Sequence, residues 1–336
     1  MDSLSQIVLG SAVAGAIAPP RHRRAALVAG AVLGTLPDLD SLPILLVTDN
    51  PVSLMTMHRG VSHSLLVLPL VGWGLWWLLR RRGGRVADSP VRWFWAIQLA
   101  LVTHPLLDAF TAYGTQLLWP LSTPPVMWSS VFIIDPLYTL WVLVACVVAW
   151  LAQARRLAQR ALIAGLMLST AYLGWSLVAK QIVDGQAAHE LAALGLSEAP
   201  RFSVAMPLNT LLWRVVAMTP DGYVIGDRSL VADRGPMRFT AYQSETQVLA
   251  QARGIETVER LLWFNRGFMR AQVVNDALVL SDLRMGAEPA YVFSFVVATR
   301  DGEAWRAVPP QRLPSAVFGS SAEGGLSGLL AGVWTR

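Results

Sequence analysis

Apolar runs of bilayer length fill the first 180 residues of this chain, and they constrain its fold more than any other feature. Of its 336 residues, 54% are hydrophobic and only 15% are charged, whereas soluble domains carry about 25% charged residues. A helix that spans a bilayer needs about 20 apolar residues. The runs predict five or six membrane segments, at residues 4–18, 25–47, 62–79, 93–113, 131–151 and 161–179. The first is short enough to be re-entrant instead.

Arginine-rich loops alternate with loops that hold almost no basic residues. The basic loops follow the first segment, join the third to the fourth and join the fifth to the sixth, whereas residues 48–61 contain only Arg59 and residues 114–130 contain no Lys or Arg. The positive-inside rule makes the arginine-rich loops cytoplasmic. We therefore expect a multi-pass membrane protein whose chain after Lys180 lies outside the cytoplasm.

Beyond residue 180 the composition becomes more polar. Asp221-Gly222 separates two strand-like runs, 211–219 and 223–230, and predicts a β-hairpin. Residues 245–264 are predicted to be helical and 291–299 to be a strand. The expected fold class is a membrane α-helical bundle of five or six segments at residues 1–180, followed by a soluble α+β domain at 181–336 with a Gly/Ser-rich tail from Gly319.

Ionisable residues stand in or beside the apolar runs, where burial is costly and a functional role is the default interpretation. His104 and Asp108 are four residues apart, so both side chains share one helix face. The arginine pattern also assigns the following residues to the outer ends of their segments: Asp38, Asp40, His58, His63 and Asp135. Because the orientation used arginine positions alone, this convergence predicts one shared site near the outer membrane interface.

Three histidines and several carboxylates are suitable ligands for one or two divalent ions. We expect zinc, with manganese or iron as alternatives. A bound ion would activate water, Asp40 or Asp135 would act as the general base, and Arg59 would steady an anionic group such as phosphate. Ser62, Ser64 and Thr111 could orient the ligands. Gly30 and Gly34 form a GxxxG pair, to which we assign close helix packing and no chemistry.

Each candidate also has a structural interpretation. His104 and Asp108 could satisfy one another as a buried pair, and Pro37-Asp38-Leu39-Asp40 could be a turn that ends a helix, because Asp favours turns. His58 and His63 could be interfacial loop residues, and Asp135 before Pro136 could simply begin a helix.

Six stretches carry a family resemblance: the opening MDSLSQIVLG, PDLD at 37–40, HRGVSHS at 58–64, HPLLD at 104–108, GTQLLWP at 114–120 and IDPLY at 134–138. In this order they resemble the YdjM-like family of bacterial inner-membrane proteins, described as metal-dependent hydrolases. The resemblance covers roughly residues 1–180. It implies a metal-dependent hydrolase role for these residues: Asp38, Asp40, His58, His63, His104 and Asp108. Many relatives carry His where this chain has Gln6, whose amide oxygen is the weaker ligand.

The leading functional hypothesis is a membrane-embedded, metal-dependent hydrolase of the bacterial inner membrane. Its substrate would be a lipid or lipid-linked ester or phosphoester near the outer face, and membrane lipids would be its partners. A transporter or ion pathway using the same intramembrane charges is an alternative, and so is a non-catalytic scaffold with a structural metal. Nucleic acid is excluded as a partner, because basic loops beside apolar segments indicate topology. The oligomeric state is left open.

Overall fold

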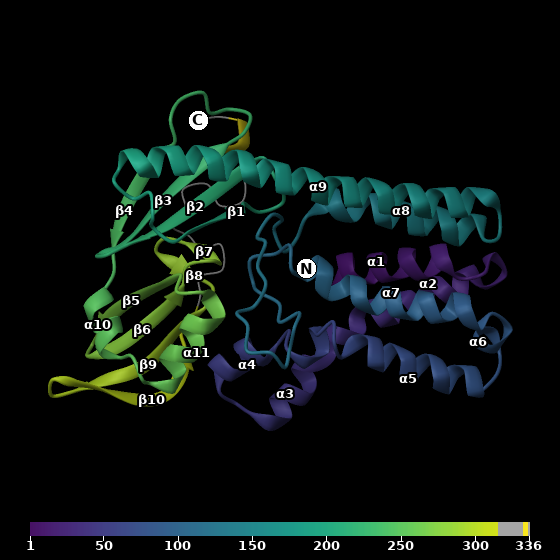
Figure 1. Cartoon of the computed structure of the whole chain (residues 1–336), viewed down its shortest axis with the longest axis horizontal. Coiled ribbons are helices and arrows are strands. Elements are labelled where there is room, and N and C mark those ends of the chain that lie inside the picture. Colours follow the sequence, from purple (N-terminus) through teal and green to yellow (C-terminus); the bar gives the residue numbers. More distant parts are fainter. Residues whose placement is uncertain (315–331, 335–336) are drawn as a thin grey trace. The chain divides into compact units, whose positions relative to one another are not determined.

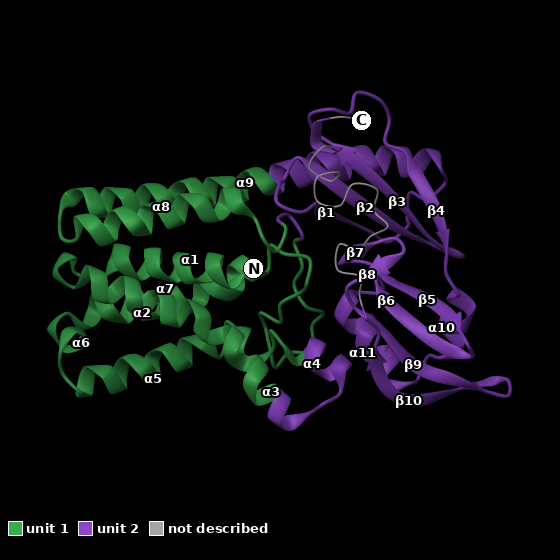
Figure 2. Ribbon diagram, turned by 180° about the vertical axis from the view of Figure 1, so that it is seen from behind, with its two compact units in different colours: residues 1–44, 57–128, 132–176 green, residues 45–56, 129–131, 177–336 purple. Residues whose placement is uncertain are grey.

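The computed structural model describes residues 1–314 and 332–334, and these form two compact units (Figure 2). Unit 1 comprises residues 1–44, 57–128 and 132–176, and unit 2 comprises 45–56, 129–131 and the described residues from 177 onward. The predicted Gly/Ser-rich tail lies outside the described residues, apart from 332–334.

Unit 1 is helical (Figure 1). Its helices are α1 (Ser3–Ile17), α2 (Arg23–Thr35), α5 (Leu68–Arg81), α6 (Arg85–Asp88), α7 (Pro90–Asp108) and α8 (Pro136–Ala152), with the beginning of α9 (Arg156–Ala193). Three 3₁₀ turns interrupt them, namely η1 (Pro20–His22), η2 (Leu36–Asp40) and η3 (Val61–His63). The short helices α3 (Ser41–Val47) and α4 (Pro51–Met57) each cross a unit boundary.

Helices α1 and α2 pack backbone against backbone, and glycine permits this approach. A Cβ added at Gly30 would lie 2.2 Å from the carbonyl oxygen of Gly10, and one added at Gly10 would lie 2.3 Å from that of Gly30. No side chain fits at such distances. Helix α1 also contacts α7 and α8, so it lies at the centre of unit 1.

The five- or six-segment bundle is not confirmed. Among the described residues, two helical stretches are long and apolar enough to cross a membrane, Pro20–Val47 and Arg156–Ala193. A third candidate is the pair Pro51–His63 and Leu68–Arg81, which is bent by 55° at a short break. Helices α1 and α8 are apolar but shorter than a span. The run predicted to be one segment at 25–47 is divided by η2, and the one predicted at 62–79 begins in η3 and becomes an α-helix only at Leu68.

Unit 2 contains two four-stranded antiparallel sheets and a two-stranded ribbon. The first sheet has the order β1 (Arg201–Ala205), β2 (Leu212–Thr219), β3 (Gly222–Ser229) and β4 (Phe239–Gln243). The second has the order β10 (Ala304–Arg312), β9 (Ser294–Asp301), β6 (Ala277–Asp282) and β5 (Met269–Val274), and the ribbon pairs β7 (Gly286–Ala287) with β8 (Ala290–Tyr291).

The first sheet buries one face against α9. Trp213 and Val215 of β2 are buried and belong to one apolar cluster with Ala179, Val183 and Ala187 of α9. The β2–β3 hairpin occurs as predicted, with Thr219 opposite Gly222 across the turn. The helix predicted at 245–264 is instead two helices, α10 (Thr246–Gln251) and α11 (Glu256–Asn265), separated by a turn in which Gly254 has a φ of +89°.

Candidate metal centre

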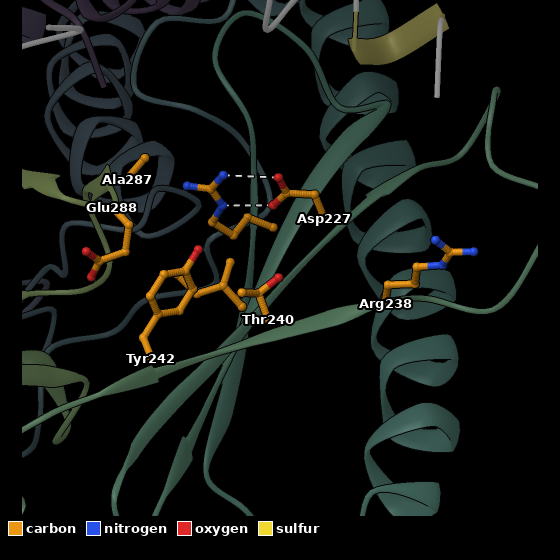
Figure 3. Close-up of a pocket in the computed structure, with 8 residues that line it drawn as sticks. Asp227, Arg238, Thr240, Tyr242, Ala287 and Glu288 are labelled. Carbon is orange, nitrogen blue, oxygen red and sulfur yellow. Dashed lines mark hydrogen bonds and ion pairs between the residues drawn. The ribbon is translucent and has the colours of Figure 1, made fainter. Parts of the chain in front are cut away.

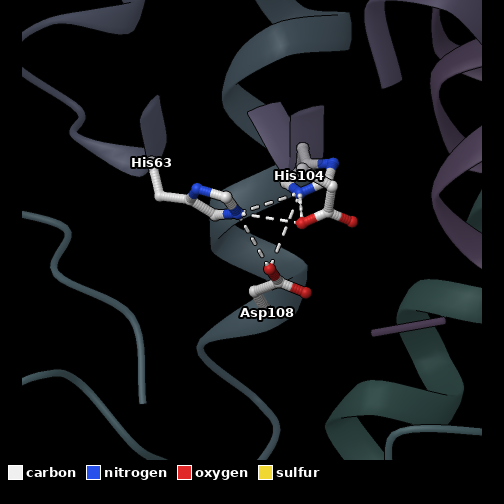
Figure 4. A group of neighbouring side chains, drawn as sticks. His63, His104 and Asp108 are labelled. Carbon is white, nitrogen blue, oxygen red and sulfur yellow. Dashed lines mark hydrogen bonds and ion pairs between the residues drawn. The ribbon is translucent and has the colours of Figure 1, made fainter. Parts of the chain in front are cut away.

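Four side chains from three segments of unit 1 converge on one point. His104 and Asp108 lie in the last turns of α7, Asp38 lies in η2 and His63 ends η3. Figure 4 shows the His63, His104 and Asp108 side chains directed toward one another. One nitrogen or oxygen from each of the four residues lies within 4.8 Å of the others, so these residues can hold a metal ion. The predicted i, i+4 pair thus supplies half of the group.

The spacing of the four atoms fits a tetrahedral site. His63 Nε2 and His104 Nε2 are 3.1 Å apart, and each lies 3.3 Å from Asp38 Oδ1. Asp108 Oδ2 lies 3.2 Å from His63 Nε2 and 3.6 Å from His104 Nε2. Ligand atoms placed 2.0–2.1 Å from a zinc ion would be about 3.3–3.4 Å apart at the corners of a tetrahedron. Five of the six edges of the group, from 3.1 to 3.6 Å, bracket that value.

The other ring nitrogens indicate which tautomer each histidine adopts. His104 Nδ1 lies 2.6 Å from the carbonyl oxygen of Gly34 and donates to it, because a carbonyl only accepts. This oxygen is available because the last carbonyls of a helix have no partner within it. His63 Nδ1 lies 2.9 Å from Ser62 Oγ, which itself donates to Asp40 at 2.5 Å. Both Nε2 atoms therefore present lone pairs to the centre.

This arrangement fits a cation. Two imidazole lone pairs and two carboxylate oxygens face one another in a buried space, where Asp38 Oδ1 accepts no hydrogen bond and Asp108 Oδ2 has only an ion pair with Arg59. Buried acceptors without donors are costly. A metal ion would satisfy all four at once, so the donor set itself matches the predicted divalent ion. Nitrogen and oxygen donors do not by themselves distinguish zinc from manganese or iron.

Both carboxylate oxygens of Asp108 also have partners outside the group of four. Gln6 Nε2 donates to Asp108 Oδ1 at 2.9 Å, and Arg59 Nε forms an ion pair with Asp108 Oδ2 at 3.1 Å. The Arg59 guanidinium is buried, lies over the ring of Tyr113 and donates to Thr111 Oγ1. Gln6 thus orients a carboxylate through its amide nitrogen. Arg59, predicted to steady a substrate anion, is bonded to Asp108.

Asp40 and His58, two of the six predicted ligands, lie outside the group of four. Asp40 Oδ1 is 2.7 Å from His58 Nδ1, and Asp40 Oδ2 accepts from Ser62 and from the backbone N–H of Arg59. A 3₁₀ turn has about three residues per turn, so residues two apart point about 120° away from each other. Asp38 and Asp40 therefore face different partners, and Asp40 supports the centre through Ser62.

Asp135, predicted as a possible general base, begins a helix. Its Oδ1 accepts from the N–H groups of Leu137 and Tyr138 in the first turn of α8, and its Oδ2 accepts from the Tyr172 hydroxyl at 2.8 Å. Asp135 is thus the N-cap residue of α8, which agrees with the alternative interpretation that it simply begins a helix. The role of Gly34 in orienting His104 was missed, because a backbone carbonyl leaves no signal in a sequence.

Removing the Ser62 hydroxyl is expected to weaken metal binding without abolishing it. Ser62→Ala breaks the link between His63 Nδ1 and Asp40, and loss of such an outer partner typically costs about 10- to 100-fold in affinity. Competition with a chromogenic chelator would measure this. Ser41→Ala, which removes an exposed hydroxyl whose one partner among the described residues is the Asp38 carbonyl, is the matched control. Equal affinity for both variants would contradict the proposed link.

Comparison with known proteins identifies the family of the N-terminal half of the chain. The family described as YdjM inner membrane protein matches residues 1–183. YfhP of Bacillus subtilis (strain 168), described as uncharacterized, is 27% identical over 150 residues, which cover 40% of this chain and 42% of that protein. The match spans less than half the length of this relative, and no solved structure matches the chain. Because residues 1–183 are more than half of its 336 residues, the chain belongs to the YdjM inner membrane protein family.

Proposed function

We propose that this protein is a membrane-embedded metal-dependent hydrolase that cleaves an ester or phosphoester of a lipid or lipid-linked molecule. The observation that carries the proposal is the convergence of four buried lone-pair donors, none of them sulfur, at metal-ligand spacing. Closed structural zinc sites typically contain cysteine, whereas histidine and carboxylate sets are typical of catalytic metal sites.

We assign the following roles to the residues of the site. Asp38, His63, His104 and Asp108 would hold a divalent cation, which supplies activation of water and polarisation of the scissile group's oxygen. His58 is the best-placed general base, because Asp40 fixes its Nδ1 and its side chain is 24% exposed. Asp40 then positions this base, and the predicted direct role of Asp135 is not favoured, since its oxygens are bonded at a helix start.

A lipid substrate is supported by the apolar surface next to the site. Helix α3 begins directly after η2, which carries Asp38 and Asp40. Leu42, Leu45 and Leu46 of this helix are 63%, 58% and 90% exposed. Exposed leucines on one short helix are costly in water and favourable among acyl chains.

A structural metal is the second candidate, because four protein ligands can saturate a tetrahedral ion. The test uses the full chain in lipid nanodiscs, stripped of metal and reloaded with zinc, manganese or iron. Its substrates would be p-nitrophenyl butyrate, bis(p-nitrophenyl) phosphate and phosphatidylglycerol. We expect metal-dependent hydrolysis of at least one, and a fall of about 10²–10⁴-fold in kcat for His58→Gln with metal content unchanged.

His189→Gln is the matched control, since His189 is 83% exposed and lies near the end of α9. It should leave both turnover and metal content intact. If stripping the metal lowers thermal stability but no metal restores hydrolysis of any substrate, the structural role is supported and the hydrolase proposal fails.

A further inference from the structure

Unit 2 contains a polar pocket that the proposed hydrolase does not use. Its volume is about 290 Å³, close to the lower end of the range for small-molecule sites. The strands β2, β3 and β4 supply most of its lining, and the residue before β4, β7 and the residue after β7 supply the rest (Figure 3). The lining residues are Arg214, Ile225, Asp227, Arg238, Thr240, Tyr242, Ala287 and Glu288.

The strand register explains why these side chains meet. Arg214 pairs with Asp227 across β2 and β3, and Ile225 pairs with Thr240 across β3 and β4. Side chains alternate between the faces of a sheet. The residues next to Arg214 in the chain, Trp213 and Val215, belong to the cluster with α9. The pocket therefore occupies the sheet face opposite to the one that α9 covers.

The side chains of Arg214, Asp227 and Glu288 are fixed in the pocket before any ligand binds. Arg214 donates from Nε and Nη2 to Asp227, at 2.8 and 3.0 Å, so its guanidinium has one orientation. Glu288 accepts from Arg270 Nη1 at 3.1 Å and from the Tyr223 hydroxyl. Tyr223 in turn stacks on Tyr242, with ring centroids 5.6 Å apart. Such pre-organisation lowers the entropic cost of binding.

The charges of the lining decide which ligand chemistry it fits. The lining holds two arginines and two carboxylates, so it has no excess of positive charge of its own, and each carboxylate already pairs with an arginine, Asp227 with Arg214 and Glu288 with Arg270. Carboxylates can only accept hydrogen bonds and guanidinium groups can only donate them, whereas a hydroxyl group does both. A ligand rich in hydroxyl groups can therefore satisfy the arginines, the acids and the hydroxyls of Thr240 and Tyr242 together.

We infer that this pocket is a binding site for a neutral sugar, of the size of one monosaccharide residue. The site is independent of the metal centre, so the inference stands or falls separately from the proposed hydrolase. Thr240 and Tyr242 would contribute hydrogen bonds that can be removed without disturbing an ion pair, because no hydrogen bond or ion pair joins their side chains to other described residues.

The test is saturation-transfer NMR on the full chain in nanodiscs, with four probes: glucose, N-acetylglucosamine, glucuronate and inorganic phosphate. We expect at least one neutral sugar to bind. Thr240→Val and Tyr242→Phe should each weaken it by about 2- to 12-fold, the range for one neutral hydrogen bond. Thr299→Val removes the same hydroxyl from β9 in the other sheet and should leave the affinity unchanged.

Two patterns of probe binding by the unaltered chain would overturn the inference. One is binding of glucuronate or phosphate without binding of either neutral sugar, which would make the pocket an anion site centred on Arg238. The other is binding of none of the four probes by a preparation whose thermal unfolding is normal. A neutral sugar that binds Thr240→Val and Tyr242→Phe as tightly as the unaltered chain would also contradict it.

Discussion

Replacing either histidine of the metal centre with alanine is expected to leave the purified protein without bound metal. His63→Ala and His104→Ala each remove one corner of the tetrahedron and expose the remaining ligand atoms to water. The affinity loss should exceed the roughly 100-fold upper limit for residues that only support a ligand. Elemental analysis of the detergent-purified chain would show about one ion in the unaltered protein and almost none in either variant.

His189→Ala provides the control for this measurement, because it removes an exposed imidazole from the same chain. Size-exclusion profiles must match among the three variants, so that loss of metal is not loss of fold. Full metal occupancy in a folded His63→Ala or His104→Ala protein would refute the assignment of the centre. Retention in one variant alone would show that this histidine is not a ligand.

Replacing Gly30 with alanine is expected to destabilise unit 1 by about 3 kcal/mol, the upper end of typical overpacking costs. The added methyl group would meet the Gly10 carbonyl oxygen and carbon at 2.2 and 2.6 Å, so α1 and α2 must move apart. Because both partners are backbone, no side chain can rotate to make room. The thermal unfolding midpoint in detergent should fall by several degrees.

Gly74→Ala is the matched control, since Gly74 also lies within a helix, α5, but has no atom within 4 Å of the added Cβ. Alanine there should be neutral or stabilise the helix by up to about 1 kcal/mol. Equal midpoints for the two alanine variants would show that the close approach of α1 and α2 is not required.

The candidate site was predictable to the extent that it depends on local spacing. His104 and Asp108 were identified from an i, i+4 relation, which a helix converts directly into a shared face. The choice between Asp38 and Asp40, and between His58 and His63, was not available from the sequence. It depends on the rotation of the 3₁₀ turns η2 and η3, and hydropathy patterns do not reveal a single turn of this kind.

The fold was predictable where the hydrophobic pattern repeats, as in the β2–β3 hairpin and the apolar helices of the first half. The division of the apolar runs could not be predicted, because a stretch of leucine and valine has the same hydropathy whether it forms one helix or two. The run at 25–47 is an example: η2 separates α2 from α3 and carries Asp38. Two of the four candidate metal ligands, Asp38 and His63, thus lie in 3₁₀ turns between the helices of the first half.

The unequal burial of the four ligands has a kinetic consequence. The side chains of His63, His104 and Asp108 are 0% exposed, whereas that of Asp38 is 21% exposed. Among the four ligands solvent therefore reaches only the Asp38 side chain, and we expect an ion to enter and leave past this carboxylate. Rotation of this one side chain would set the residence time of the metal, and chelators would extract it at a rate that reflects Asp38 motion rather than the strength of the histidine bonds.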